Sequence, residues 1–310
     1  MTYYFYFCKK NMHKILAEII AGVIPDKMAR NRWRGILRFG LTNAVRLKRR
    51  LAAKAPRPAC NLAVCAIAKD EGTYFKEWIE WHIGKGVDKF IIYDNGSTDN
   101  TKSVLRPYID AGTVEYISFP GYRRQLAAYD DCLRRHRLDF NWIAFIDLDE
   151  FIVPVADKTV PEFLKRFEGR PAVEINWLVY GSSNMDKRTP GGVMQRFRFH
   201  SVPDNPLNRH VKSIVNPRLV FNMIGCHEAA CISGRAADSH GDTVTKNFRD
   251  RQPLHDVIRI NHYAVKSYEE FIEKQARGRA SGTQRSVKPE YFCRYNLNDI
   301  EDTSDYDENL

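Results

Sequence analysis

The sequence lacks the cysteine spacing of a disulfide-rich or zinc-binding domain. Its seven cysteines are an odd number, and no two of them stand in a CxxC spacing. The pattern therefore indicates neither a disulfide framework nor a zinc knuckle. Unpaired thiols suit a reducing compartment, and we expect a cytoplasmic protein.

Long uncharged hydrophobic runs are also missing. Lys9, Lys10, Lys14 and Glu18 interrupt the apolar start of the chain. No stretch there reaches the roughly 20 apolar residues that a membrane-spanning helix needs. No basic segment precedes the apolar stretch, as one would in a signal peptide. We expect neither a signal peptide nor a transmembrane helix.

Acidic residues are scarce in one part of the chain. Residues 1–58 contain 14 Lys and Arg but 2 acidic residues, a surplus of +12, so the remainder carries −2 of the overall +10. Basic chains often bind nucleic acid, but these cations are confined to one arm, and we expect no nucleic-acid partner. Near the other end, residues 286–310 form an acidic tail that we expect to be solvated.

The basic arm, residues 1–58, has apolar residues at helical spacing. These residues are Met12, Ile15, Leu16, Ile19, Ile20 and Val23. The pattern favours an amphipathic helix on an anionic membrane surface, or else helices packed on the domain with a solvated basic face. The proline-containing segment 52–60 is typical of a linker, and the main domain is expected at 59–285.

Strands and helices alternate after this linker. Apolar segments predict strands at 61–69, 88–94, 113–119 and 141–150. The segments between them predict helices within 73–86, 95–112 and 123–137. The alternation favours an α/β fold with a mostly parallel central sheet flanked by helices. Such sheets bind ligands at the carboxyl ends of their strands.

The last of these strands ends in FIDLDE, which places Asp147, Asp149 and Glu150 within four positions. Carboxylates this close repel one another unless a cation or several donors lie among them. In extended backbone, Asp147 and Asp149 would project to the same side. Two hard oxygen ligands suit Mn²⁺ or Mg²⁺, with substrate phosphates completing the shell. We predict a metal–diphosphate site here.

A second acidic residue, Asp94, stands at the end of the strand 88–94 and before the turn signal Asn95-Gly96. Its carboxylate is placed to accept hydrogen bonds from a ribose or a base edge. Alternatively, the segment is an ordinary turn in which Ser97 or Thr98 caps the next helix.

Five segments, taken in order, resemble the glycosyltransferase family 2-like and family 92 enzymes. They are AIAKDEGTYFKEWIEWHIGKGVDKFIIYDNGSTDNT, DFNWIAFIDLDEFIVP, INWLVYGSSN, KSIVNP and INHYAVKSYEEFIEKQARG. The resemblance implies a GT-A fold, a single nucleotide-sugar-binding domain in which the D-x-D motif holds Mn²⁺ against the sugar diphosphate.

The resemblance also implies roles for individual residues. Asp94 would contact the uracil or ribose, and Asp70 and Glu71 would line the nucleotide pocket. Arg124 and Gln125 would be further donor-binding positions.

Three later residues have two interpretations each. His262 is either a third metal ligand or a buried histidine with a structural role. Lys212 and Lys266 are candidates to neutralise the leaving diphosphate, or else are solvated lysines.

Sugar transfer also needs a group that accepts the proton of the acceptor hydroxyl. A carboxylate on the face of the sugar opposite the leaving group would give inversion. Asp186 is our first candidate for this base and Glu174 the second.

Together these features predict a metal-dependent, inverting hexosyltransferase of bacterial type. Its donor would be a nucleotide sugar, with a UDP-sugar favoured, and its acceptor a glycan or lipid-linked glycan in surface polysaccharide or lipopolysaccharide synthesis. The basic arm would hold it peripherally on the inner face of the bacterial inner membrane. The alternatives are a nucleotidyltransferase, a metal-dependent phosphohydrolase, and non-enzymatic membrane or nucleic-acid binding through the arm.

Overall fold

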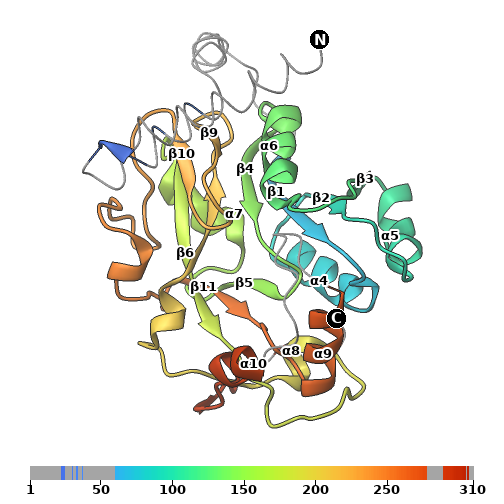
Figure 1. Ribbon diagram of the computed structural model, residues 1–310. Helices are drawn as coiled ribbons and strands as arrows, with labels where there is room; N and C mark the ends of the chain where they lie inside the picture. The colour runs from blue at the N-terminus through green and yellow to red at the C-terminus, as the bar shows by residue number, and fades with distance from the viewer. Residues whose placement is uncertain are drawn as a thin grey trace.

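A computed structural model describes residues 60–277, 289–304 and 306, together with 22–24, 30, 33 and 37 (Figure 1). The amphipathic helix predicted in the basic arm lies almost wholly outside these residues. Within the part of the chain that the structure describes, no helix has the length and apolar character needed to cross a membrane.

The first half of the domain alternates strand and helix as predicted. Its elements are β1 (Cys60–Ala68), α4 (Gly72–Gly84), β2 (Lys89–Asp94), α5 (Thr101–Asp110), β3 (Val114–Ser118), α6 (Gln125–His136) and β4 (Phe140–Phe145). Each lies within or beside its predicted segment, because every strand segment is a short apolar run bounded by polar turns.

The second half is less regular and adds the strands that complete the sheet. Its helices are α7 (Val160–Leu164), α8 (Val193–Arg196), α9 (Tyr268–Ala276) and α10 (Pro289–Tyr295), with 3₁₀ turns at Lys165–Phe167, Pro206–Arg209 and Phe248–Asp250. Its strands are β5 (Glu150–Pro154), β6 (Ala172–Val179), β7 (Phe199–His200), β8 (Val211–Val215), β9 (Val220–Met223), β10 (Ala229–Cys231), β11 (Ile258–His262) and β12 (Ile300–Glu301).

One eight-stranded sheet organises the domain, in the order β3-β2-β1-β4-β8-β6-β11-β5. β1 pairs in parallel with β2 and β4, β2 with β3, and β6 with β11. β8 is antiparallel to β4 and β6, and β5 is antiparallel to β11, so these two strands run against the other six of the eight. The predicted α/β fold with a mostly parallel central sheet flanked by helices is confirmed.

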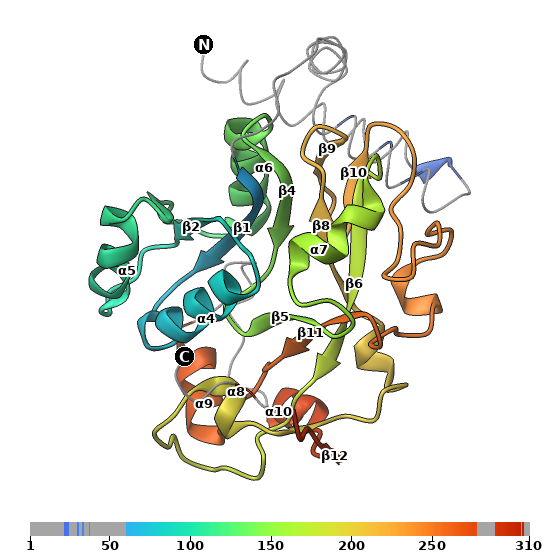
Figure 2. The same ribbon diagram turned by 180° about the vertical axis from the view of Figure 1, so that it is seen from behind.

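Side-chain alternation along the central strands divides the interior into two cores, one on each face of the sheet. On β1, Leu62, Val64 and Ala66 pack with the helix α4, whereas Ala63 and Cys65 pack with α6 and β9. The two opposite views show α4 and α7 on one face and α6 with the β9–β10 hairpin on the other (Figures 1 and 2). Burial on both faces explains why β1 reads as a continuous apolar run.

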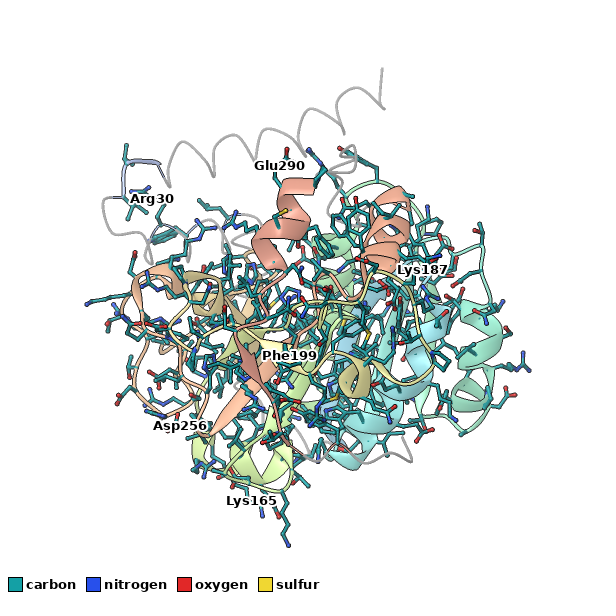
Figure 3. The ribbon with its side chains drawn as sticks, turned by 90° about the horizontal axis from the view of Figure 1, so that it is seen from below. Arg30, Lys165, Lys187, Phe199, Asp256 and Glu290 are labelled. Atoms are coloured by element: carbon teal, nitrogen blue, oxygen red, sulfur yellow. The ribbon has the colours of Figure 1, made fainter. Side chains whose placement is uncertain are left out.

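The acidic tail is partly packed on the domain. β12 pairs with β7, and the carboxylate of Asp302 is buried, where it accepts hydrogen bonds from the hydroxyls of Tyr180 and Tyr306 and faces Arg259. The expectation that the tail is solvated is therefore wrong for Asp302, because these donors replace water around its charge. Glu290, at the exposed start of α10, does face solvent (Figure 3).

A buried ion pair fastens α9 to the domain. The Glu270 carboxylate, 3% exposed, accepts hydrogen bonds from both terminal nitrogens of Arg196, each at 2.9 Å, and from Ser267 Oγ at 2.6 Å and Tyr74 Oη at 2.9 Å. Burial alone would raise the pKa of Glu270, but these donors lower it to about 2. The ionised carboxylate is therefore the form that the fold requires.

This depressed pKa predicts an acid-sensitive contribution to stability. Glu270 should stabilise the fold by about 3 kcal/mol above pH 4.5, and that contribution should disappear as the pH falls from 4.5 to about 2. Urea unfolding of the wild type and of Glu270→Gln at pH 7 and at pH 3 measures it. The variant should be less stable at pH 7 and closer to the wild type at pH 3. A difference that does not depend on pH would contradict the prediction.

Candidate functional site

A cavity of about 320 Å³ opens at the carboxyl edge of the sheet. It lies where β1, β4, β6 and β11 end, and α9 and α10 lie at the same end of the sheet (Figure 1). Its polar lining comes from Lys69, Glu71, Gln125, Asp147, Asp149, Trp177, His210, Lys212, His227, His262, Lys274, Arg277, Tyr291 and Tyr295. The edge predicted to bind ligands is therefore the one that carries a pocket.

The D-x-D segment that lines this cavity is a turn and not the extended strand we assumed. The backbone N–H of Glu150 donates to the carbonyl of Asp147 at 3.1 Å, which reverses the chain between β4 and β5. Asp147 and Asp149 nevertheless both line the cavity. The turn directs the two carboxylates to different partners.

Asp147 is held by Lys212 and Gln125. Its Oδ2 accepts from Lys212 Nζ at 2.7 Å, and its Oδ1 accepts from Gln125 Nε2 at 3.1 Å. Lys212 comes from β8, is 1% exposed, and also lies 3.3 Å from the buried Glu150 carboxylate. Burial opposes the charged lysine, yet Asp147 and Glu150 raise its pKa well above the usual value. Lys212 is therefore a buried cation of the site and not a solvated lysine.

Asp149 is held by Lys274 and His262. Its side chain is buried, and its Oδ2 accepts from Lys274 Nζ on α9 and lies 3.6 Å from His262 Nε2. Burial alone would raise the pKa of Asp149, but Lys274 and His262 hold it well below the usual value. The cation that the three carboxylates require is thus supplied by two ammonium groups, one for each aspartate of the motif.

His262 is buried at the end of β11. Burial lowers its pKa despite the nearby Asp149, so the imidazole is neutral at pH 7, the form in which histidine binds metals. Its Nδ1 is buried and has no hydrogen-bond partner among the residues that the structure describes. Oxygen donors from Asp149 and Asp147 and a neutral imidazole suit Mn²⁺. The side chains therefore fit a divalent cation on the condition that Lys274 moves away from Asp149.

The described part of the chain shows no preformed cluster of metal ligands. Among residues 60–277 and the other described positions, no group of three or more His, Cys, Asp or Glu side chains is arranged to hold a metal ion. Metal binding at Asp147, Asp149 and His262 therefore stays a prediction.

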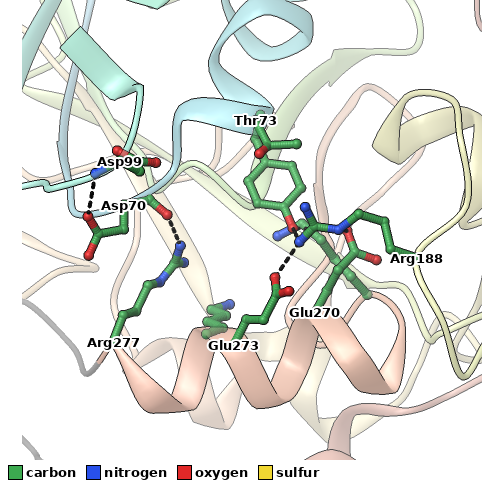
Figure 4. Close-up of a pocket in the computed structure, with 10 residues that line it drawn as sticks. Asp70, Thr73, Asp99, Arg188, Glu270, Glu273 and Arg277 are labelled. Atoms are coloured by element: carbon green, nitrogen blue, oxygen red, sulfur yellow. Dashed lines mark hydrogen bonds and ion pairs between the residues drawn. The ribbon is translucent and has the colours of Figure 1, made fainter.

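Glu71 and Asp70 follow β1, but they meet different cavities. Glu71 lines the main cavity and accepts from Arg277 at the end of α9. Asp70 lines a second cavity of about 210 Å³, which shares Lys274 and Arg277 with the first, and its carbonyl accepts from Arg277 at 2.7 Å (Figure 4). The Asp70 carboxylate accepts from the backbone N–H of Thr98 at 2.7 Å. It thereby ties the loop after β1 to the loop after β2.

Asp94 lies at the end of β2 and is buried. Its Oδ1 accepts from the backbone N–H of Ser97 at 2.9 Å, and its Oδ2 accepts from the hydroxyl of Tyr116. It lines neither of the two cavities. The carboxylate thus shapes the turn, and a contact between Asp94 and a nucleoside stays a prediction.

The remaining predicted donor-binding residues are divided between the two cavities and the turn before α6. Gln125 lines the main cavity, whereas Arg124 stacks its guanidinium on Phe119 at 3.9 Å and lines neither cavity. Lys266 lines the second cavity, 2% exposed, with its ammonium 4.2 Å from the centre of the Tyr74 ring. Burial, with the added effect of Lys274, lowers the pKa of Lys266 to about 8. Lys266 is not a solvated lysine.

Neither predicted base lies at the cavity. Asp186 is exposed on the loop that precedes α8 and lines neither cavity. Glu174 is buried in the middle of β6 and forms an ion pair with Arg251. Strand alternation places it on the opposite face of β6 from Trp177, which does line the cavity. The sequence does not indicate which face of β6 or which loop meets the cavity, and the structure places neither carboxylate there.

The cavity instead contains residues that sequence reasoning missed. Lys274 and Arg277 lie on and just after α9, inside a segment quoted for its family resemblance, but helical spacing alone gave them no role. His210 directly precedes β8, His227 lies between β9 and β10, and Trp177 lies near the end of β6. A position beside a strand end is a signal for a ligand-binding residue. It gave no indication here because β6 and β8 were not predicted as strands.

The chain is similar to several known proteins. Residues 61–281 match the family model described as Glycosyltransferase family 92. The chain is 29% identical over 119 residues to a Glycosyltransferase family 92 protein of Oryza sativa subsp. japonica, a match covering 38% of this chain and 20% of that protein. It is 27% identical over 175 residues to galactan beta-1,4-galactosyltransferase GALS2 of Arabidopsis thaliana, covering 52% of this chain and 34% of GALS2.

A nematode protein is also similar. The chain is 24% identical over 205 residues to beta-1,4-galactosyltransferase galt-1 of Caenorhabditis elegans, covering 62% of this chain and 44% of that protein. The chain thus spans about a fifth of the first relative and less than half of the other two. These relatives come from plants and a worm, so they do not support the bacterial type that we predicted.

Two solved structures are also similar. TarS residues 1–349 from S. aureus match with a TM-score of 0.35 and 14% identity, over 51% of this chain and 48% of that chain. Glucosyl-3-phosphoglycerate synthase from Mycobacterium tuberculosis, in complex with Mn²⁺, UDP and glucosyl-3-phosphoglycerate, matches with a TM-score of 0.27 and 19% identity, over 44% of this chain and 48% of that chain.

Proposed function

Because the chain belongs to glycosyltransferase family 92, we propose that it transfers a hexose from a nucleotide sugar to a glycan acceptor. The observation that carries the proposal is the cavity at the carboxyl edge of the sheet, which brings both D-x-D carboxylates together with Lys212, Lys274 and Arg277. A nucleoside diphosphate needs positive charge around its phosphates, and Lys212, Lys274 and Arg277 are cations of the cavity wall that can supply it.

Two of these cations have a further role in the proposed reaction. The bond between the sugar and the diphosphate breaks with negative charge developing on the leaving group. Lys212 and Lys274 are buried or nearly so, which strengthens their attraction for that charge. A divalent cation held by Asp147, Asp149 and His262 would add Lewis-acid stabilisation to the same phosphates.

We propose galactose as the first sugar to test and UDP as the nucleotide. The support for galactose is that GALS2 and galt-1 are named as galactosyltransferases. The acceptor is proposed to be a glycan, free or linked to a lipid. We also propose a role in the synthesis of surface polysaccharide or lipopolysaccharide and a peripheral position on the inner face of a membrane. Both proposals are based on the sequence of the basic arm. Co-sedimentation with anionic liposomes, with and without residues 1–58, tests that location.

The activity is tested by incubating the protein with a panel of UDP-sugars, Mn²⁺ and galacto-oligosaccharide acceptors. A lengthened oligosaccharide and released UDP are expected, and EDTA should suppress both. UDP with Mn²⁺ should also raise the melting temperature more than UDP with EDTA. Release of sugar phosphate without a lengthened glycan would contradict the proposal and favour a phosphohydrolase or nucleotidyltransferase.

A further inference from the structure

The acceptor hydroxyl needs a proton acceptor, and the carboxylates that line the main cavity are already engaged. Glu71 accepts from Arg277, Asp147 from Lys212 and Asp149 from Lys274. Protonating any of them would break an ion pair. Among the described residues that line this cavity, the remaining neutral acceptors with nitrogen lone pairs are the imidazoles of His210, His227 and His262.

His262 is the least suited of the three to act as a base. Its Nε2 lies 3.6 Å from Oδ2 of Asp149. It therefore belongs to the end of the cavity that holds the D-x-D carboxylates. A base for inverting transfer must lie on the other side of the sugar from the diphosphate.

His210 is oriented for proton transfer by its neighbours. Its Nδ1 lies 3.0 Å from the carbonyl oxygen of Leu207. A carbonyl only accepts hydrogen bonds, so Nδ1 carries the proton and Nε2 keeps its lone pair. The ring stacks on Trp177 with centroids 4.9 Å apart and planes 15° apart, and contacts Phe248 at 5.2 Å. Both the tautomer and the ring plane are thereby fixed.

His227 has the same tautomer but is a weaker base. Its Nδ1 lies 2.7 Å from the Val211 carbonyl oxygen. Burial, with the added effect of Lys212, lowers the pKa of His227 to about 3. A group that resists protonation so strongly is a poor acceptor for a hydroxyl proton. Its Nε2 is better suited to accept a hydrogen bond from a sugar hydroxyl.

We propose that Nε2 of His210 is the general base that accepts the proton of the acceptor hydroxyl, an inference that rests on the proposed function. The acceptor oxygen forms a bond to the anomeric carbon as the bond from that carbon to the diphosphate oxygen breaks. The bonding electron pair leaves with the nucleoside diphosphate, and the hydroxyl proton passes to Nε2. The Leu207 carbonyl, which accepts from Nδ1–H, stabilises the imidazolium that results.

The charges around His210 agree with this role. Burial lowers the pKa of His210 below the usual 6.5, and the positive charges of Arg249 and Arg294, together with His262, lower it further. The Leu207 carbonyl has the opposite effect and raises this pKa. The ring of His227 faces the ring of His210, with 5.4 Å between their centroids. His210 is therefore neutral at pH 7, as a base must be. The acidic limb of kcat/KM should lie below pH 6.5 and reflect one proton.

The test compares His210→Gln with His227→Gln and with His240→Gln, an exposed histidine that lines neither cavity. Glutamine keeps a polar side chain but accepts no proton. His210→Gln should lower kcat for transfer by about 10²–10⁴-fold, leave UDP affinity unchanged, and remove the acidic limb of the pH profile. His227→Gln should mainly raise KM, and His240→Gln should match the wild type.

Three outcomes would overturn the inference. Transfer by His210→Gln within about tenfold of the wild type would exclude a base at this position. If His210→Gln lost UDP affinity or folded protein to the same extent as it lost activity, His210 would have a structural role. UDP titrations measure the affinity of each variant, and melting curves measure its folding. A wild-type protein that binds UDP but transfers no sugar would overturn the proposed function and this inference with it.

Discussion

Replacing Asp149 with Asn is expected to lower sugar transfer by about a thousandfold, the scale of losing a group that stabilises charge in a transition state. The change preserves the shape of a buried side chain but removes the charge that Lys274 and His262 face. A divalent cation would lose an anionic ligand, and Lys274 would lose its counter-ion. The effect on activity should therefore exceed the effect on folding.

The folding cost should be modest but measurable. Lys274 also donates to the carbonyl of Ala264 at 2.9 Å, so its ammonium keeps one partner in the variant. We expect the free energy of unfolding to fall by about 1–3 kcal/mol, the cost of one poorly satisfied buried polar group. Asp147→Asn should lose transfer similarly with a smaller folding cost, because its side chain is 33% exposed.

Steady-state transfer, Mn²⁺ titration by calorimetry and urea unfolding measure these effects together. Asp186→Asn is the matched control, since it removes a carboxylate that is exposed and lines neither cavity. It should behave as the wild type, whereas Asp149→Asn should lose Mn²⁺ affinity as well as turnover. Near-normal turnover of purified Asp149→Asn at saturating Mn²⁺ would contradict a role for this carboxylate in the reaction.

The first half of the fold could be predicted from the sequence because its signals are local. The strands β1, β2 and β4 are buried on both faces, so each is a short apolar run, and the helices α4 and α6 begin after polar turns. The D-x-D motif follows β4 directly, and its place at the ligand-binding edge follows from the parallel order of the strands. The motif and its edge were therefore predictable together.

The rest of the site depends on contacts between distant parts of the chain. Lys274 meets Asp149 across 125 positions and Lys212 meets Asp147 across 65, so no local period indicates either pairing. The same limit applies to the two predicted bases, which do not line the cavity. Glu174 has the carboxylate that a catalytic base needs, and it is buried. Side chains alternate between the two faces of β6, however, so Glu174 lies on the face away from the cavity. His210 lies between the 3₁₀ turn Pro206–Arg209 and β8, and its sequence neighbours do not indicate that geometry.

The second large effect is expected for Lys212→Met, which should reduce both stability and transfer. Methionine fills similar space but carries no charge, and Asp147 and the fully buried Glu150 would then share a site without the ammonium between them. Breaking a buried ion pair by removing one partner costs about 3–5 kcal/mol. Transfer should fall as well, because a cation that we place against the leaving diphosphate is lost.

Urea unfolding and steady-state transfer measure this pair of effects, with Lys187→Met as the control because Lys187 is an exposed lysine on a loop (Figure 3). Lys187→Met should change neither quantity. Lys212→Arg should recover part of the stability, since it restores the charge but must fit a larger planar group into a buried position. Wild-type stability in Lys212→Met would show that the ion pair does not hold this turn in place.

The pH dependence of the Lys212→Met variant separates lost charge from lost packing. In the wild type, burial raises the pKa of Glu150 to about 8 although Lys212 opposes the rise. A carboxyl with a raised pKa in the folded state favours folding while it is protonated and loses that contribution as the pH rises through the folded pKa.

Without Lys212 the ionised carboxylates repel without compensation, so the stability deficit of the variant should be largest above pH 8. It should shrink as the pH falls through about 8, because Glu150 is protonated in the folded state below that pH. A deficit that stays constant from pH 8.5 to pH 5 would instead assign the loss to packing, and would contradict the electrostatic role that we give Lys212.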